Sequence, residues 1–390
     1  MKRKTSILTY ASIISLFICT GGGTLENSAL QTMIEAWPDV STSMIRMLTT
    51  LPSFISMFVM IIVGKIVGKK LPYKTSVLTG TLLIAVGGIV PFFIHPSWIM
   101  ILVFRAVIGV GIGFAALGNA LMMRTAPAES LARLIGYGGI ISSLGGVVMN
   151  FIVGNLTKMG WNYAFLANIE YLIPFVLCLF FLREPEKIES PKEKVKKEPI
   201  PKAVYVFIAM QFVSTMVLYP LLSGISSYLS SVGISDTAIA GTMLSIYTGG
   251  GMVGNFLLPY IKKALGKNTL IFAYGLVVVG VALVITVHQV VVIGAGIFLS
   301  GMGFITLMSG YQVYNGLICT PGQMASASTM VLAANQLGVF LSTFFIELTG
   351  NIGVFDNEIT NTLLVCLIAY VIMTVIILLS RHKLLEGAEE

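Results

Sequence analysis

The chain has 390 residues, of which 56% are hydrophobic and 11% are charged, and its mean hydropathy is +0.91. A soluble domain of this composition would lack the polar surface needed to cover its core, so the composition excludes a water-soluble protein and indicates a membrane protein. The net charge of +7 is spread over alternate loops rather than gathered on one face, which argues against nucleic acid as a partner.

Twelve runs in the sequence are long and apolar enough to cross the hydrocarbon core of a lipid bilayer, which is about 30 Å thick. Runs this long and this uniformly apolar are typical of helices and not of the alternating segments of a membrane barrel. The sequence therefore predicts an all-α integral membrane protein with twelve transmembrane helices. In chain order they cover residues 7–34, 44–64, 74–94, 98–123, 132–156, 162–182, 203–230, 237–261, 268–287, 290–318, 322–348 and 358–380.

A charged stretch without aromatic residues, REPEKIESPKEKVKKEPIPK, divides the chain near its middle. It predicts an N-terminal six-helix bundle over residues 1–182, a linker over 183–202 and a C-terminal six-helix bundle over 203–390. Lys and Arg concentrate at the termini, in the linker and in every second loop, whereas the other loops carry mainly acidic residues. By the positive-inside rule, the termini and the linker are predicted to be cytoplasmic in a multi-pass protein of the cell membrane.

The two halves are similar to each other when one is shifted by about 193 residues. The turn KKLPYKTSVLTG then aligns with KKALGKNTLIFAYG, and the Gly-rich fourth span aligns with the tenth, so that Pro127 falls on Pro321. The alternative is that Gly-rich spans and basic turns resemble one another without a common origin. A true repeat makes the bundles pseudo-symmetric and predicts a substrate site between them, near the middle of the bilayer.

The glycines inside the spans, Gly109, Gly111 and Gly113 in the fourth and Gly249–Gly251 in the eighth, are predicted to allow close contact between helices. A phosphate-binding loop would need a preceding strand, and none is predicted. Tyr219 and Pro220 predict a break in the seventh span. The three His residues form no cluster with Cys or acidic residues, so no metal site is predicted.

Three local patterns resemble motifs of the major facilitator superfamily, and the resemblance extends over essentially the whole chain. VFRAVIGVGIG, residues 103–113, resembles the fourth-span pattern R-x-x-x-G-x-G, with Arg105 as the membrane-embedded arginine. GKIVGKKLPYK, residues 64–74, resembles the loop G-x-x-x-D-R-x-G-R-[RK] between the second and third spans. GWNYAF, residues 160–165, resembles the G-W-R-x-x-F that opens the sixth span of the family.

The loop between the second and third spans implies a gating role for Gly64, Lys69 and Lys74, with Gly64 at the first glycine and Lys69 at the arginine. Gly68 stands where the family has an acidic residue, so the salt bridge of that residue is not expected here. The G-P-x-x-G-G signature of antiporters is replaced in the fifth span by GYGGIISSLGGVVMN, which weakens an antiport assignment.

The resemblance implies a secondary transporter that works by alternating access of its two bundles, as a monomer, without a cofactor and without enzymatic activity. The sequence contains no nucleotide-binding loop, which argues against ATP-driven transport. Its internal polar residues are mostly neutral, and this favours a small organic solute. Proton-coupled export is preferred, with uptake by symport or uniport as the alternative. A membrane sensor or scaffold with a carrier-like fold is the hypothesis from another class.

Glu26 and Arg105 are the leading pair of charges inside the predicted spans. An unpaired charge in the middle of a membrane helix costs on the order of 2.5–3.5 kcal/mol, so such residues are usually paired and functional. Both are predicted in the middle to outer half of the bilayer, with Glu26 as the proton-responsive group and Arg105 as its partner. The alternatives are a static ion pair, or a Glu26 that reaches the outer interface. Proton-coupled members of the family often carry an acidic residue near this position, where Asn27 is the closer match in register.

A substrate cavity is predicted from polar and aromatic side chains on the spans that usually line the cavity in this family. Some are four residues apart and project from one face of a helix. For each of them, hydrogen bonding between helices is as consistent with the sequence as contact with a solute. The set comprises Asn27, Gln31, Asn119, Asn150, Tyr219, Tyr247, Tyr311, Gln312, Asn315, Asn335 and Gln336.

Overall fold

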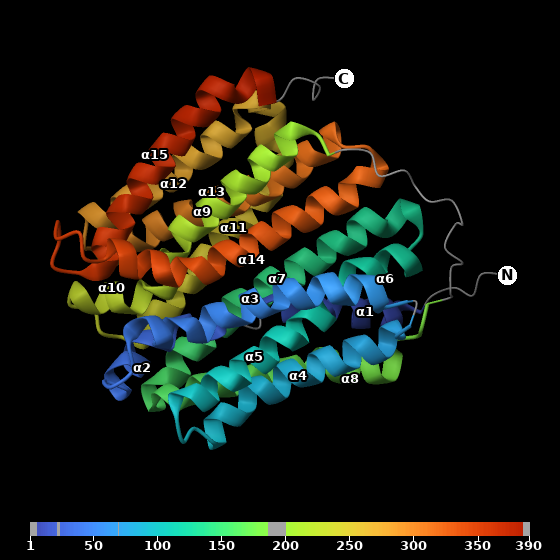
Figure 1. Ribbon diagram of the computed structural model, residues 1–390, viewed down its shortest axis with the longest axis horizontal. Coiled ribbons are helices and arrows are strands. Elements are labelled where there is room, and N and C mark those ends of the chain that lie inside the picture. Colours follow the sequence, from blue (N-terminus) through green and yellow to red (C-terminus); the bar gives the residue numbers. More distant parts are fainter. Residues whose placement is uncertain (1–5, 22–23, 69, 186–199, 385–390) are drawn as a thin grey trace. The chain divides into compact units, whose positions relative to one another are not determined.

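The computed structural model describes residues 6–21, 24–68, 70–185 and 200–384 (Figure 1). Contacts within the chain divide it into two compact units. The first unit comprises Met1–Ser190 with Thr237–Gly241, and the second comprises Pro191–Asp236 with Thr242–Glu390.

The described part of the first unit is helical, and several of its helices are interrupted or extended by 3-10 turns. Its α-helices are α1 (Ile7–Ser15), α2 (Leu30–Ala36), α3 (Thr42–Ile66), α4 (Tyr73–Phe93), α5 (Trp98–Ala115), α6 (Gly118–Thr125), α7 (Ala128–Leu156) and α8 (Leu172–Phe181). Its 3-10 segments are η1 (Leu16–Gly21), η2 (Leu25–Ala29), η3 (Thr157–Met159) and η4 (Trp161–Tyr171).

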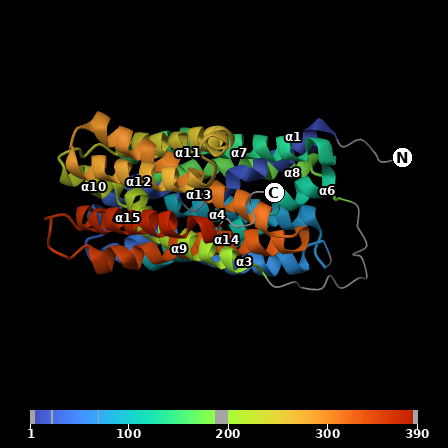
Figure 2. The same ribbon diagram turned by 90° about the horizontal axis from the view of Figure 1, so that it is seen from above.

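The second unit consists of long helices with one 3-10 turn, η5 (Gly266–Asn268). Figure 2 shows α12 running alongside α13 and α15. The helices are α9 (Lys202–Ser223), α10 (Ile225–Ser231), α11 (Thr237–Leu265), α12 (Thr269–Thr286), α13 (Val290–Ile318), α14 (Pro321–Thr349) and α15 (Glu358–Leu384).

Ten helical segments in the described ranges are long and apolar enough to cross a membrane. One of them, Thr237–Thr286, contains both the eighth and the ninth predicted spans, because α11, η5 and α12 follow one another without a gap. The first predicted span contains the shorter apolar helix Ile7–Cys19. The all-helical membrane fold is confirmed. A count of twelve is reached only when Thr237–Thr286 is counted as two spans and the helical pieces of the first predicted span are counted as one.

Glycines bring α4 close to α5 in the first unit and α12 close to α13 in the second. A Cβ on Gly111 of α5 would lie 2.8 Å from the backbone nitrogen of Ile84, and a Cβ on Gly303 of α13 would lie 3.0 Å from that of Val277. The predicted repeat aligns Ile84 with Val277 and, within one residue, Gly111 with Gly303. These matching positions therefore pack in the same way. Of the glycines predicted to serve helix contact, Gly109, Gly111, Gly113, Gly250 and Gly251 do so, whereas a Cβ on Gly249 would meet nothing within 4 Å and the prediction is wrong for that residue.

The first, sixth and seventh predicted spans are not continuous α-helices. The first contains η1 and η2, and the sixth begins with the eleven-residue 3-10 segment η4. Runs of 3-10 helix this long are uncommon and often mark a hinge or local strain. In the seventh span, α9 continues through Pro220 and the break lies at Gly224, which corrects the predicted position. A Cβ at Gly224 would meet the side chain of Ile359 at 2.7 Å, so the interruption falls where the chain needs glycine.

Candidate functional site

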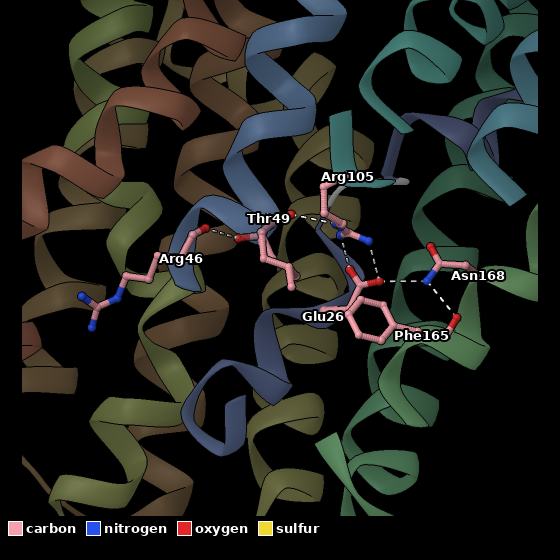
Figure 3. A network of polar contacts seen from close by, with 7 residues as sticks. Glu26, Arg46, Thr49, Arg105, Phe165 and Asn168 are labelled. Carbon is pink, nitrogen blue, oxygen red and sulfur yellow. Dashed lines mark hydrogen bonds and ion pairs between the residues drawn. The ribbon is translucent and has the colours of Figure 1, made fainter. Parts of the chain in front are cut away.

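Glu26 and Arg105 form an ion pair in the interior of the first unit (Figure 3). Nη1 of Arg105 donates to Oε1 of Glu26 at 2.9 Å, and Nη2 donates to Oε2 at 2.5 Å. Both side chains are 0% exposed. A two-bond contact between a guanidinium and a carboxylate is among the strongest polar interactions in proteins, and it fixes the geometry of both groups.

Asn168 is a third member of the site. It lies on η4, and its Nδ2 donates to Oε1 of Glu26 at 2.8 Å and to the carbonyl of Phe165 at 3.0 Å. Its side chain rests on Gly88 of α4, where a Cβ would overlap the Asn168 amide. The carboxylate of Glu26 thus accepts hydrogen bonds from a charged and a neutral donor on two different helical segments.

The backbone of α3 supplies another partner for Arg105. Nε of Arg105 donates to the carbonyl of Leu48 at 2.8 Å. In a regular helix that carbonyl would accept from the N–H of residue 52, but residue 52 is a proline and has no N–H. The ring of Phe165 lies beside the guanidinium, with its centroid 6.0 Å from Cζ. Arg105 is therefore held by groups from η2, α3 and η4.

This geometry bears on the alternatives that the sequence left open. Glu26 does not reach the surface of its unit, and Glu26 rather than Asn27 pairs with Arg105. Arg46, the other buried arginine of this region, has its guanidinium directed away from the pair in Figure 3. Burial of two charges in an apolar interior is tolerated only when they are paired and hydrogen-bonded, and this site meets both conditions.

The other predicted cavity residues of the first unit are not gathered around this pair. Asn27 is buried on η2, and Gln31 on α2 donates from Nε2 to Oε1 of Glu35 at 2.9 Å. Asn150 lies partly exposed on α7. Asn119 belongs to α6, and its side chain lies outside the described part of the structure.

In the second unit, Tyr311 belongs to a buried network of hydroxyl groups. The hydroxyls of Tyr311 and Tyr274 are 2.5 Å apart, and that of Tyr274 lies 3.1 Å from Oγ of Ser214. Tyr370 donates to the carbonyl of Ser214 at 3.0 Å. The network joins α9, α12, α13 and α15, so the hydroxyl of Tyr311 is engaged in bonding between helices.

A cluster of amides lies between α9 and α14. Oδ1 of Asn335 accepts from Nε2 of Gln211 at 3.0 Å and from Oγ1 of Thr215 at 2.9 Å, and its Nδ2 donates to Oε1 of Gln336 at 3.4 Å. Gln211 and Thr215 are buried, whereas Asn335 and Gln336 are partly exposed. Oε1 of Gln211 has no hydrogen-bond partner among the described residues. The partly exposed amides of the cluster are thus those of Asn335 and Gln336, whereas Oε1 of Gln211 is buried.

The remaining predicted residues of this unit differ in burial. Tyr219 and Tyr247 are each 7% exposed. Asn315 is fully buried, and neither polar atom of its side chain has a partner in the described structure. Gln312 is partly exposed, so it does not share the buried face of α13 that carries Tyr311 and Asn315.

The predicted gating loop contacts the start of the linker through Lys74. The backbone nitrogens of Tyr73 and Lys74 donate to the carboxylate of Glu184 at 2.7 and 2.8 Å, and Nζ of Lys74 donates to the carbonyl of Leu179 at 2.8 Å. Glu184 thus caps the N-terminal end of α4, where a negative charge is favourable. The bonds to Glu184 connect α4 to the segment that follows α8, and the bond from Lys74 to Leu179 connects α4 to α8 itself.

The other two residues predicted for this loop are Gly64 and Lys69. A Cβ on Gly64 would meet nothing within 4 Å, and Lys69 lies outside the described residues. Gly68 has φ of +78°, and a Cβ there would lie 2.7 Å from the ring of Tyr73. The turn therefore needs glycine where the family motif has an acidic residue.

Sequence reasoning missed Asn168 and the carbonyl of Leu48. An Asn in an otherwise apolar span indicates a hydrogen bond to another helix, and this could have pointed to Asn168. A proline in the middle of a span indicates that the carbonyl four residues earlier lacks its helical donor. Within the described residues, no group of three or more His, Cys, Asp or Glu could hold a metal ion.

A family model described as Major Facilitator Superfamily matches residues 12–343. No curated protein sequence matches the chain. Among solved structures, a mutant of the nucleoside transporter NupG is 12% identical with a TM-score of 0.76, over 96% of this chain and 99% of that one. A D-xylose-proton symporter is 13% identical with a TM-score of 0.75, over 98% of each chain. A POT family transporter in complex with 5-aminolevulinic acid is 13% identical with a TM-score of 0.74, over 97% and 96%. At these identities the likeness concerns the fold.

Proposed function

Since the chain belongs to the major facilitator superfamily and is a secondary transporter, we propose that it couples the movement of a small organic solute to that of protons. It acts as a monomer in the cell membrane, by alternating access, with both termini and the linker in the cytoplasm. Export of the solute is the proposed direction, and uptake by symport or uniport is the alternative that the transport experiment resolves.

The buried pair of Glu26 and Arg105 carries the proposal of proton coupling. The ionised carboxylate accepts from both Nη atoms of Arg105 and from Asn168. A protonated carboxyl carries a donor on one oxygen and no net charge, so its bonds to Arg105 lose the attraction between opposite charges and become weaker. Proton uptake would therefore weaken the attachment of η2 to α5 and η4, and a conformational change could follow from it.

The amide cluster of the second unit supports a neutral, polar solute. The cluster presents the amides of Asn335 and Gln336 as partly exposed groups, next to the buried amide of Gln211. Its members are uncharged, and neutral amides recognise hydroxyl and amide groups in both directions. A polyanion would call for several basic groups instead. The first solutes to test are nucleosides, D-xylose and 5-aminolevulinic acid, which the titles of the structurally similar proteins name.

Transport by the purified protein in liposomes tests this function. An imposed pH gradient should drive accumulation or export of at least one solute of the panel, with proton movement recorded by an internal pH dye. Glu26→Gln should abolish concentrative transport while retaining exchange of the solute across the membrane. Glu347→Gln, which changes an exposed carboxylate on α14, is the matched control and should transport like the unaltered protein.

Two outcomes would contradict the proposal in different ways. Concentrative, proton-driven transport by Glu26→Gln would remove Glu26 from the coupling and leave a static ion pair. Protein that moves no member of a broad panel would favour a sensor or scaffold with a carrier-like fold.

A further inference from the structure

Pro52 leaves one backbone carbonyl of α3 without its helical donor, and Arg105 takes the place of that donor. The carbonyl of Leu48 accepts from Nε of Arg105 at 2.8 Å. A buried carbonyl without a partner is unfavourable in an apolar interior, so this bond satisfies the backbone as well as the side chain. Unlike a carboxylate, a backbone carbonyl does not titrate. Arg105 thus has one partner that a proton can neutralise and another that it cannot.

Close contacts on both sides of Arg105 hold α5 against α3. A Cβ on Gly109 would lie 2.8 Å from the carbonyl oxygen of Pro52, so the two backbones touch at this level. At the beginning of α5, Nε1 of Trp98 donates to the carbonyl of Met44 at 2.9 Å. The helix that carries Arg105 is therefore packed and hydrogen-bonded to α3 independently of Glu26.

Glu26, by contrast, lies on a short 3-10 segment. η2 spans Leu25–Ala29 and leads directly into the short helix α2, whose last residue is Ala36. The 3-10 helix has poorer hydrogen-bond geometry than the α-helix, and such stretches often mark hinges. The bonds from Arg105 and Asn168 to Glu26 both depend on the carboxylate as acceptor.

We propose that Pro52 is a positioning residue for Arg105, and that the carbonyl it frees holds Arg105 on α3 when Glu26 is protonated. The segment Leu25–Ala36, and not α5, is then the part that moves. This inference rests on the proposed function, in which Glu26 takes up the proton. Charged or titratable groups around Glu26 are Arg105 on α5 and Glu170 and Tyr171 on η4, whereas Arg46 on α3 points away (Figure 3). Glu26→Gln removes a charge beside Glu170 and Tyr171, so the effect of Pro52→Ala is compared between chains that have the same residue at position 26, at one fixed pH.

Hydrogen exchange measured by mass spectrometry on the full chain in lipid nanodiscs tests the inference without a solute. Glu26→Gln mimics the protonated carboxyl. Relative to the unaltered protein, it should cause peptides of Leu25–Ala36 to lose protection, while peptides of α5 keep theirs. Pro52→Ala restores the N–H that competes for the carbonyl of Leu48. It should leave α5 protected by itself, and it should cause α5 to lose protection when combined with Glu26→Gln.

Two control sets keep the result specific to Arg105. Pro91→Ala, at a proline in the interior of α4 in the same unit, should not change α5 in the Glu26→Gln background. A chain that carries both Glu26→Gln and Arg105→Gln has no guanidinium that could bond to the carbonyl of Leu48. In that chain Pro52→Ala should no longer affect α5. If Glu26→Gln with Pro52→Ala does not fold, folding of the triple variant with Arg105→Gln would support the proposal, and its failure to fold would overturn it.

Loss of protection in α5 with Glu26→Gln alone, or no added effect of Pro52→Ala, would also overturn the proposal. The proposed function fails by a different observation, namely proton-driven concentrative transport by Glu26→Gln. The two failures are therefore distinguishable.

Discussion

The two units share a pattern of helix packing but differ in the polar groups that this packing encloses. A shift of 192 residues takes Gly109 to Gly301 and Gly111 to Gly303, and it takes Arg105 to Ile297, which is 2% exposed. The first unit encloses an ion pair where the second has an aliphatic side chain. The second unit instead encloses uncharged tyrosine hydroxyls and amides. The comparison indicates that the glycine contacts build the bundle and that the residues beside them are free to differ.

This difference suggests a division of tasks within the proposed transporter. A buried charge pair changes its bonding when one proton is added, because one of its two charges disappears. A neutral network has no such response near neutral pH, but it can exchange hydrogen bonds with a polar solute. We therefore assign the response to protons to the first unit, and contacts with the solute to the amide cluster of the second.

Arg105→Ile gives the first unit the residue that the second unit has, and it should have the largest effect. It leaves Glu26 as an uncompensated charge in the interior, and breaking a buried pair in this way costs about 3–5 kcal/mol. We expect a strong decrease in the melting temperature of the purified protein in detergent.

The paired replacement Glu26→Leu with Arg105→Ile serves as the control for that variant. It removes both charges, and replacement of a buried pair by apolar residues is often neutral or stabilising. Its melting temperature should recover most of the loss while proton-driven transport remains absent. A double variant as unstable as Arg105→Ile alone would mean that the first unit requires the pair for packing, and the comparison between the units would then break down.

Gly88→Ala should have the next largest effect, and it acts on the ion pair without changing a charged residue. The new Cβ would overlap the amide of Asn168, which donates to Glu26. Overpacking of this kind costs about 1–3 kcal/mol. Gly139→Ala on α7 is the matched control, since a Cβ there meets nothing within 4 Å, and it should be neutral or slightly stabilising.

Gly88→Ala and Gly139→Ala are compared by thermal unfolding in two backgrounds, the unaltered chain and the chain with Glu26→Leu and Arg105→Ile. The comparison separates steric strain from loss of the hydrogen bond between Asn168 and Glu26. The cost of Gly88→Ala should become smaller when no carboxylate needs the amide of Asn168. An equal cost in both backgrounds would show that Asn168 contributes packing only.

The fold class could be predicted from the sequence, because a bilayer dictates both the length of the apolar segments that cross it and the distribution of Lys and Arg between the loops. The sequence was also sufficient to single out Glu26 and Arg105 because charges inside apolar runs are rare. It could not give Asn168 its role, since the register of the 3-10 segment η4 decides which side chain reaches Glu26. Helical spacing grouped Tyr311, Gln312 and Asn315, but spacing does not tell which face of a helix is buried.

Tyr274→Phe should have the smallest effect of these changes, because it tests the neutral network of the second unit. The substitution removes the hydroxyl that lies between Tyr311 and Ser214 and leaves the ring in place. Loss of a neutral hydrogen-bond partner in the interior costs about 1–3 kcal/mol when a buried group remains unsatisfied. Here Tyr311 and Ser214 can adjust their hydroxyls toward each other, so we expect the lower end of that range.

Tyr260→Phe, at a tyrosine that is 65% exposed, controls for the loss of a phenol and should leave the melting temperature unchanged. The pH dependence of transport should be the same in Tyr274→Phe as in the unaltered protein, because no charge is added or removed in the second unit. A shifted pH dependence would place part of the proton response in the tyrosine network, and the division of tasks between the two units would no longer hold.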